Sequence, residues 1–151
     1  LSNADSMAER SLIEFGKNIG MAFQLVDDVM DYDSSEELLG KPVGNDLKEG
    51  HVTLPLLYLY RNSNSSFKKD IEAFIQNDKL TDEEFIFIQD KMREGKAIEY
   101  TLDLARDYID KAKTFLNPSM FEESEYLDAC FAVADNIIER HLATRPALNQ
   151  T

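Results

Sequence analysis

Residues 12–31 read LIEFGKNIGMAFQLVDDVMD, and this stretch decides the fold. Apolar residues recur in it at three- and four-residue steps, which is the period of one face of an α-helix. This apolar stripe consists of Leu12, Phe15, Ile19, Phe23, Val26 and Met30. Ser6 and Glu9 are spaced as a capping box, in which a hydroxyl and a carboxylate cap the first turn of a helix. The stretch therefore predicts one long amphipathic helix that opens at Ser6.

The helical period continues through the rest of the chain. Further helices are predicted over residues 54–60, 67–75, 81–92, 98–116 and 119–138. The expected N-cap residues are Thr53, Thr81 and Ser119, the last two in capping boxes with Glu84 and Glu122. The expected breaks are the polar connector 61–66, Gly95 and Asn117-Pro118. Strand-like alternation is absent, so we predict a single all-α domain over residues 1–151, built as a helical bundle.

The charge balance argues against two classes of partner. The chain has 151 residues, of which 29 are acidic and 16 basic, and its net charge is −13. Nucleic acids need a basic stripe and anionic membranes attract basic segments, so we expect neither partner. No apolar run is long enough for a transmembrane helix. Cys130 is the one cysteine, which excludes an internal disulfide and favours a cytoplasmic location. It falls on an apolar stripe and is predicted to be a core residue.

The second half of the first helix gathers carboxylates on one side. At about 100° per residue, Gln24, Asp27, Asp28 and Asp31 share that side. A solvated helix face gives the same pattern, so both interpretations stay open. However, like charges at helical spacing repel each other, and a bound cation would reverse the repulsion. Because Mg²⁺ takes one or two carboxylates and leaves its other positions to water and phosphate, the three aspartates are candidate Mg²⁺ ligands.

Glycines flank this acidic side. Gly16 and Gly20 lie on roughly the same side one and two turns earlier, where small residues let another helix or a flat apolar ligand approach; plain helix packing explains them equally well. Residues 40–50 then hold three of the six glycines, together with Lys41 and Lys48. A glycine-rich loop with ammonium groups can fold over a phosphate.

These motifs fall in the order and spacing of a known family. They are Phe23-Gln24, the aspartate triplet, Gly40-Lys41-Pro42, Asp46, Gly50, Thr53-Leu54-Pro55 and Ile137-Ile138-Glu139-Arg140. The chain resembles the trans-isoprenyl diphosphate synthases, the polyprenyl synthetase family, and within it the bacterial heptaprenyl and polyprenyl enzymes. The likeness corresponds to the C-terminal half of such a synthase, so it implies the C-terminal portion of the isoprenoid synthase fold.

The resemblance implies a reaction and a role for each motif residue. The family condenses isopentenyl diphosphate with an allylic diphosphate, and Mg²⁺ binds the diphosphate that leaves. By resemblance, the metal ligands are Asp27, Asp28 and Asp31, Gln24 lies near the reacting centre, and Lys41 and His51 contact diphosphate. The family usually has a lysine in place of His51, and histidine is only partly charged near neutral pH, so weaker diphosphate binding is expected there.

The family's first aspartate-rich motif does not occur in these 151 residues. We therefore expect this polypeptide alone to be catalytically inactive. One alternative is a non-catalytic helical partner subunit of a heteromeric prenyl synthase. A class I terpene cyclase is the other, although the Gly-Lys-Pro and Thr-Leu-Pro elements disfavour it. Half of a bundle exposes its former packing surface, so we also expect a homodimer or a heteromer.

Overall fold

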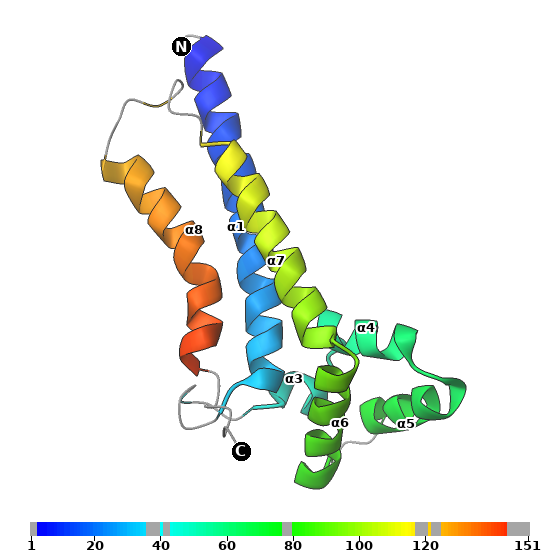
Figure 1. Cartoon of the computed structure of the whole chain (residues 1–151). Helices are drawn as coiled ribbons and strands as arrows, with labels where there is room; N and C mark the ends of the chain where they lie inside the picture. Colours follow the sequence, from blue (N-terminus) through cyan, green and yellow to red (C-terminus); the bar gives the residue numbers. More distant parts are fainter. Residues whose placement is uncertain are drawn as a thin grey trace.

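Three long helices form the body of the molecule (Figure 1). The structure, a computed structural model, describes residues 3–35, 40, 43–76, 80–116, 121 and 125–144. Helices α1 (Asn3–Asp33), α7 (Ala97–Thr114) and α8 (Glu125–Thr144) pack against one another, with α7 antiparallel to the other two. Within the described ranges every regular element is a helix, which confirms the all-α prediction.

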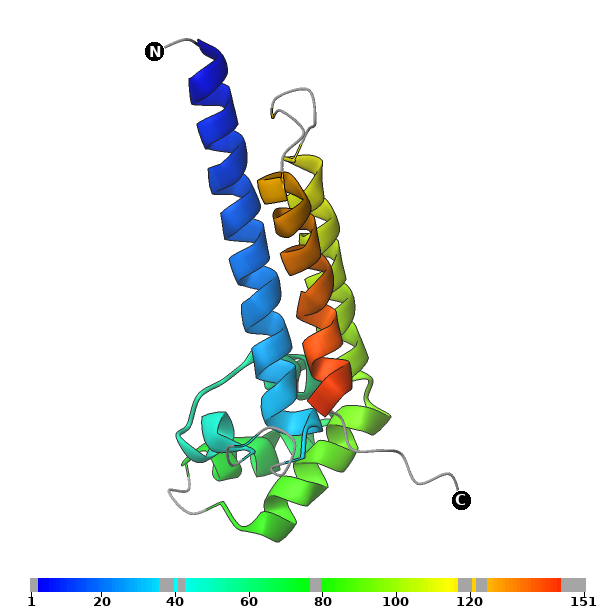
Figure 2. The same ribbon diagram turned by 90° about the vertical axis from the view of Figure 1, so that its left-hand side faces the viewer.

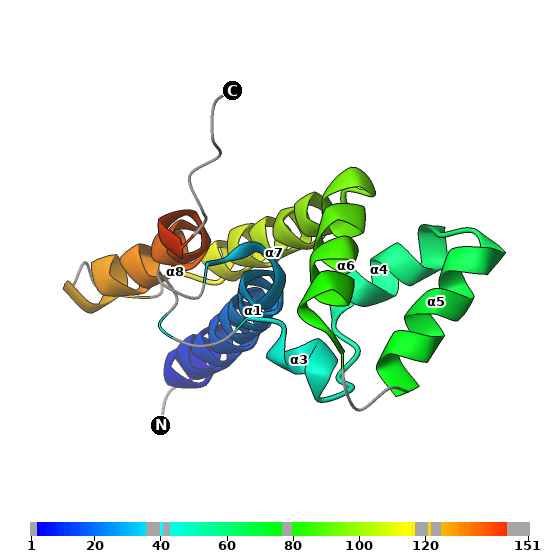
Figure 3. The same ribbon diagram turned by 90° about the horizontal axis from the view of Figure 1, so that it is seen from below.

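Four shorter helices gather at the end of the bundle where α1 terminates. They are α3 (Asn45–Lys48), α4 (Leu54–Asn62), α5 (Ser65–Gln76) and α6 (Asp82–Glu94). Seen from below, α3 lies beside the end of α1, and α4 and α6 connect this cluster to α7 (Figure 3). The aspartates of α1 thus lie where the long helices meet the short ones.

Helix ends follow local sequence signals in two of the testable cases. The Thr81 hydroxyl accepts the N–H of Glu84 at 3.2 Å, and the Glu84 carboxylate accepts the N–H of Thr81 at 2.8 Å, so the predicted capping box is confirmed. Gly95 follows the last residue of α6, as predicted. The breaks and caps expected at Asn117-Pro118 and Ser119 fall outside the described residues.

Two other predicted ends are wrong, and a third is right in position only. Helix α1 begins at Asn3, so Ser6 and Glu9 lie inside its first turns and do not open it. The connector expected over residues 61–66 is shorter, because α4 continues to Asn62 and α5 begins at Ser65. Thr53 does occupy the N-cap position of α4, but its hydroxyl makes no capping hydrogen bond. It donates instead to the hydroxyl of Tyr32 at 3.4 Å.

One hydrophobic core joins the described helices. Its α1 members are Phe15, Ala22, Leu25, Val26, Val29, Met30 and Tyr32, and from α7 it takes Ala97, Ile98, Leu102, Ala105, Ile109 and Ala112. Cys130 packs against this core and is partly buried. Among the described helices, none combines the length and the apolar character needed to cross a bilayer.

The apolar stripe predicted on α1 is only partly buried. Leu12 is 46% exposed and Phe23 is 44% exposed. We call the exposed residues Leu12, Ile13, Gly16, Gly20 and Phe23 the open face of α1. A side chain at either glycine would meet no described atom within 4 Å. In Figure 2 the first turns of α1 extend past the ends of α7 and α8.

Candidate functional site

The three aspartates of α1 have different surroundings. Asp28 is 7% exposed and accepts a hydrogen bond from Gln24 Nε2 at 2.7 Å. Burial raises the pKa of the Asp28 carboxyl, and the negative charges of Asp46 and Asp27 raise it further, against hydrogen bonds from Gln24 and the backbone of Leu54. A carboxylate that is buried among other carboxylates is a group that a cation would stabilise.

The Asp31 carboxylate accepts hydrogen bonds from the backbone of the next helix, α3. Its Oδ1 accepts the N–H of Asn45 at 3.2 Å, and its Oδ2 accepts the N–H of Asp46 at 3.1 Å. Its carbonyl oxygen accepts the N–H of Gly44 at 2.8 Å. The first-turn N–H groups of a helix have no partner within that helix. Asp31 therefore caps α3 from outside it and fixes this helix to the end of α1.

Asp27 is the most accessible of the three. Its side chain is half-buried, and Oδ1 lies 3.6 Å from Nη2 of Arg140 on α8. The guanidinium carbon of Arg140 lies 4.4 Å from the centre of the Phe23 ring. Gln24, one turn before Asp28, is exposed. The structure thus brings Gln24, Asp27 and Asp28 together at one end of the open face.

Only one of the two basic residues expected to contact diphosphate lies within the described part of the chain. His51 is exposed, and its Nδ1 lies 3.7 Å from a carboxylate oxygen of Asp46 and 3.7 Å from one of Glu49. Lys41 falls outside the described residues. Lys48 Nζ lies 3.9 Å from a carboxylate oxygen of Asp82 and 5.7 Å from the centre of the Phe85 ring. Of the two predicted diphosphate contacts, His51 is the one that can be located, and it shares Asp46 with the aspartate cluster.

The carboxylates of Asp27 and Asp28 are the type of donor that Mg²⁺ prefers. Hard oxygen donors suit this ion, which is commonly held by one or two carboxylates together with water and phosphate. Asp27 and Asp28 supply such donors, whereas both oxygens of Asp31 already accept N–H groups. Within the described part of the chain, no group of three or more His, Cys, Asp or Glu is arranged to hold a metal ion. The assignments of Asp27, Asp28 and Asp31 as metal ligands all stay predictions.

The sequence did not indicate a buried polar cluster beside this site. Asp33 Oδ1 lies 3.2 Å from Nε of Arg93 on α6, and Asp33 Oδ2 lies 3.1 Å from Nε2 of His141 on α8. Asp33 and His141 are almost fully buried. These residues are 60 and 108 positions apart in sequence, so no local spacing could have revealed them. They join the ends of α1, α6 and α8, and Asp33 follows Asp31 by two residues.

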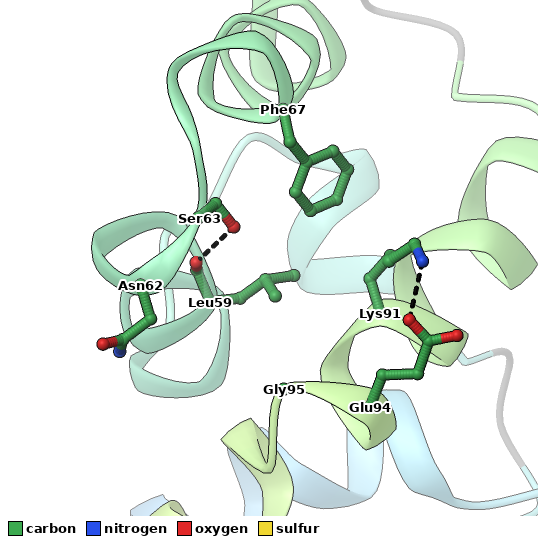
Figure 4. Close-up of a pocket in the computed structure, with 7 residues that line it drawn as sticks. All are labelled: Leu59, Asn62, Ser63, Phe67, Lys91, Glu94 and Gly95. Carbon is green, nitrogen blue, oxygen red and sulfur yellow. Dashed lines mark hydrogen bonds and ion pairs between the residues drawn. The ribbon is translucent and has the colours of Figure 1, made fainter.

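Surface pockets also lie apart from these three aspartates. One of about 240 Å³ lies between α4, α5 and α6, lined by Leu59, Asn62, Ser63, Phe67, Lys91, Glu94 and Gly95 (Figure 4). Its polar groups already bind one another: Lys91 Nζ lies 2.6 Å from Glu94, and the Ser63 hydroxyl donates to the Leu59 carbonyl at 2.7 Å. No residue of α1 lines it, so it is separate from the aspartate cluster.

Comparison with known proteins decides the family. The family model described as polyprenyl synthetase matches residues 1–92. The chain belongs to this family. A polyprenyl synthetase relative, heptaprenyl diphosphate synthase component 2 of Bacillus subtilis, is 38% identical over 116 residues, which are 77% of this chain and 32% of that protein. Octaprenyl diphosphate synthase of Haemophilus influenzae is 38% identical over 135 residues, 88% of this chain and 40% of the relative.

Solved polyprenyl synthases share the fold. The polyprenyl synthase of Caulobacter crescentus, complexed with calcium and isoprenyl diphosphate, matches with a TM-score of 0.81 and 35% identity over 93% of this chain. The heptaprenyl diphosphate synthase of Staphylococcus aureus matches with a TM-score of 0.75 and 32% identity over 87%. The chain covers 42% and 40% of these two proteins. It therefore corresponds to less than half the length of its relatives.

Proposed function

We propose that the chain is the C-terminal part of a polyprenyl diphosphate synthase, which condenses isopentenyl diphosphate with an allylic diphosphate in the cytoplasm. The motif order supports the C-terminal placement, from the aspartate triplet to Arg140. Relatives named as heptaprenyl and octaprenyl diphosphate synthases support the reaction. The Caulobacter neighbour, which holds calcium and isoprenyl diphosphate, supports a metal-bound diphosphate.

The observation that carries this proposal is the pair Asp27 and Asp28 at the end of the open face. Asp27 is accessible, and the Asp28 carboxyl has a pKa raised by burial and by neighbouring negative charge. A Mg²⁺ ion held by these carboxylates would offset the negative charge of the diphosphate and so assist its departure. Gln24 orients Asp28 through its hydrogen bond. Asp31 positions the segment that follows α1 by capping α3.

Other residues would hold the organic substrate and its diphosphate. Lys41 and His51 follow α1 in the sequence, one before and one after α3, and we assign them to the diphosphate oxygens. The open face of α1 continues from the aspartates along Phe23, Gly20 and Gly16. Its exposed apolar character suits a hydrocarbon chain or another helix. A polar head and an apolar tail would thus follow the same helix.

A heteromeric role is the second candidate, because one relative is named component 2 of a heptaprenyl diphosphate synthase. In that case the chain would supply its aspartates to a site completed by a different polypeptide. For either role we propose that the 151-residue chain has no turnover by itself. Incubation with labelled isopentenyl diphosphate, an allylic diphosphate and Mg²⁺ tests this, and product formation would refute it.

Metal binding tests the site directly. Mn²⁺ replaces Mg²⁺ in many carboxylate sites and its binding is followed by electron paramagnetic resonance. Asp27→Asn and Asp28→Asn should each weaken Mn²⁺ binding. In isothermal titration with excess Mg²⁺, both variants should also bind inorganic diphosphate more weakly than the wild type. Asp107→Asn removes an equal charge from an exposed position on α7 and should change neither measurement. Equal affinities for all four proteins would contradict the assignment.

The expected assembly is tested separately. The apolar residues of the open face favour a homodimer or a heteromer. Light scattering at tens of micromolar should give a mass above that of one chain, or a second prenyl synthase chain should co-purify. A mass of one chain in light scattering, together with no co-purifying prenyl synthase chain, would count against this expectation.

A further inference from the structure

Arg140 reaches α1 from the last turns of α8 and contacts it at two points. Its Nη2 lies 3.6 Å from Asp27 Oδ1, and its guanidinium carbon lies 4.4 Å from the centre of the Phe23 ring. The side chain is 42% exposed. The guanidinium therefore sits on an aromatic ring, beside a carboxylate that the proposed function assigns to a divalent cation. Arginine favours both contacts because its charge is delocalised over a plane.

The residues that follow Arg140 fix its backbone to the end of α1. His141 is 1% exposed, and its Nε2 lies 3.1 Å from Asp33 Oδ2. The Thr144 carbonyl accepts the N–H of Ser35 at 3.2 Å. The lower half of α8 lies against α1 in Figure 2. Arg140 is therefore held within reach of Asp27 by bonds that do not involve Asp27.

The Asp27–Arg140 contact is suited to exchange. Both side chains are partly exposed, and ion pairs of this kind contribute about 0–1 kcal/mol, so a doubly charged ion can displace the guanidinium. The Phe23 ring would still hold the released guanidinium nearby through its cation–π contact. A free guanidinium there presents several N–H donors, a geometry that matches phosphate oxygens.

We propose that Arg140 is an exchangeable counter-ion of Asp27. Arg140 neutralises Asp27 when the site holds no divalent cation, and it turns to a diphosphate oxygen when the carboxylate is used for a cation. This inference rests on the proposed function. It makes Arg140 a residue with opposite effects on two ligands: it opposes the binding of a cation alone and favours the binding of a cation together with diphosphate.

The opposite signs give the test. In Arg140→Gln, Mn²⁺ alone should bind about twofold to fivefold more tightly, the range that an exposed ion pair supplies. Inorganic diphosphate in excess Mg²⁺ should bind about tenfold more weakly, because a charge-assisted hydrogen bond is lost. Arg140→Lys keeps the charge, so Mn²⁺ affinity should stay near that of the wild type while diphosphate affinity falls partly.

A purely structural arginine predicts another result. If Arg140 only ties α8 to α1, Arg140→Gln should lower the urea midpoint and shift both affinities in the same direction or not at all, which would overturn the inference. Arg106→Gln is the matched control, since Arg106 pairs with Asp103 on the exposed side of α7. It should change neither affinity.

The outcome for Asp27 separates this inference from the function on which it rests. If Asp27→Asn weakens Mn²⁺ binding and Arg140→Gln does not strengthen it, the counter-ion role is wrong and the metal site stands. If Asp27→Asn leaves Mn²⁺ binding unchanged, or the wild type binds no Mn²⁺, both are wrong.

Discussion

Replacing Asp31 by alanine should detach α3 from the end of α1 and lower the stability of the whole chain. Both carboxylate oxygens accept backbone N–H groups of Asn45 and Asp46, and the side chain is 3% exposed. The N-cap residue of α3 is Gly44, which is in a left-handed conformation and has no side chain with which to cap the helix. Alanine offers no acceptor, so the first turn of α3 loses its external cap.

The structure sets the size of the effect. A hydrogen bond to a charged group contributes about 1.5–3 kcal/mol. Asn45 and Asp46 are partly exposed, so water can replace some of each bond, and the lower end of that range applies. Two bonds then amount to about 3 kcal/mol, which lowers the Tm of a chain of this size by about 6–12 °C. Asp31→Asn keeps one acceptor oxygen and should lose about half as much.

Urea unfolding followed by circular dichroism at pH 7, without divalent ions, measures this effect separately from metal binding. Asp27→Ala is the control, because Asp27 is a half-buried partner in an ion pair and its loss should cost less than about 1 kcal/mol. If Asp31→Ala and Asp27→Ala lower stability equally, then Asp31 is not a structural cap. Stability should also rise from Asp31→Ala through Asp31→Asn to the wild type, and any other order would contradict the capping role of Asp31.

Three further changes test neighbouring features. Gly44→Ala should cost roughly 1–3 kcal/mol more than Gly40→Ala. Both glycines have positive φ (+75° and +72°), but a Cβ at Gly44 would lie 2.7 Å from Cζ of Phe85, while one at Gly40 would meet no described atom within 4 Å. Urea midpoints measure the difference. Asp28→Asn should stabilise the chain at pH 7, and the gain should shrink as the pH falls toward 3.8, since a raised pKa means that folding disfavours the ionised carboxyl; a gain that is constant with pH would contradict this. His51→Lys should tighten the binding of inorganic diphosphate in Mg²⁺ several-fold at pH 8, by isothermal titration, because lysine stays charged there; unchanged affinity would remove His51 from the site.

The helices that the sequence located correctly carry their signals locally. Thr81 and Glu84 cap each other within one turn, and Gly95 ends α6 a single residue after the last helical position. Such signals depend on a few neighbouring residues and survive any tertiary arrangement. The failure at Ser6 has the complementary cause: a serine and a glutamate three residues apart also occur inside a helix, where the backbone N–H groups already have partners.

Periodicity found the apolar positions of α1 but not the neighbours that cover them. Leu12 and Phe23 fit the same stripe as Phe15 and Val26, yet the first two are exposed and the last two are buried. The helix has apolar residues over more of its circumference than α7 and α8 cover. A single sequence gives the width of an apolar surface, whereas the division between core and open face depends on the packed helices.

The same limit applies to the site. Asp27, Asp28 and Asp31 are equivalent in sequence, and the resemblance assigns all three to the metal. Tertiary contacts make them different, because Asp31 meets the first turn of α3, Asp28 is buried near Asp46, and Asp27 meets Arg140. The short helix α3 was not predicted, so a capping role for Asp31 could not be anticipated.

Several features of α1 lower the stability of this chain and share one cause. Glycine inside a helix costs about 0.5–1 kcal/mol relative to alanine, and neither Gly16 nor Gly20 is required by a described neighbour. Phe23 leaves an aromatic ring exposed, and Asp28 holds a carboxyl whose ionisation its surroundings disfavour. Packing of the chain's own core explains none of these choices. A hydrocarbon chain or a helix over the open face, together with a cation at the aspartates, would relieve all of them, which is why we place the function on this helix.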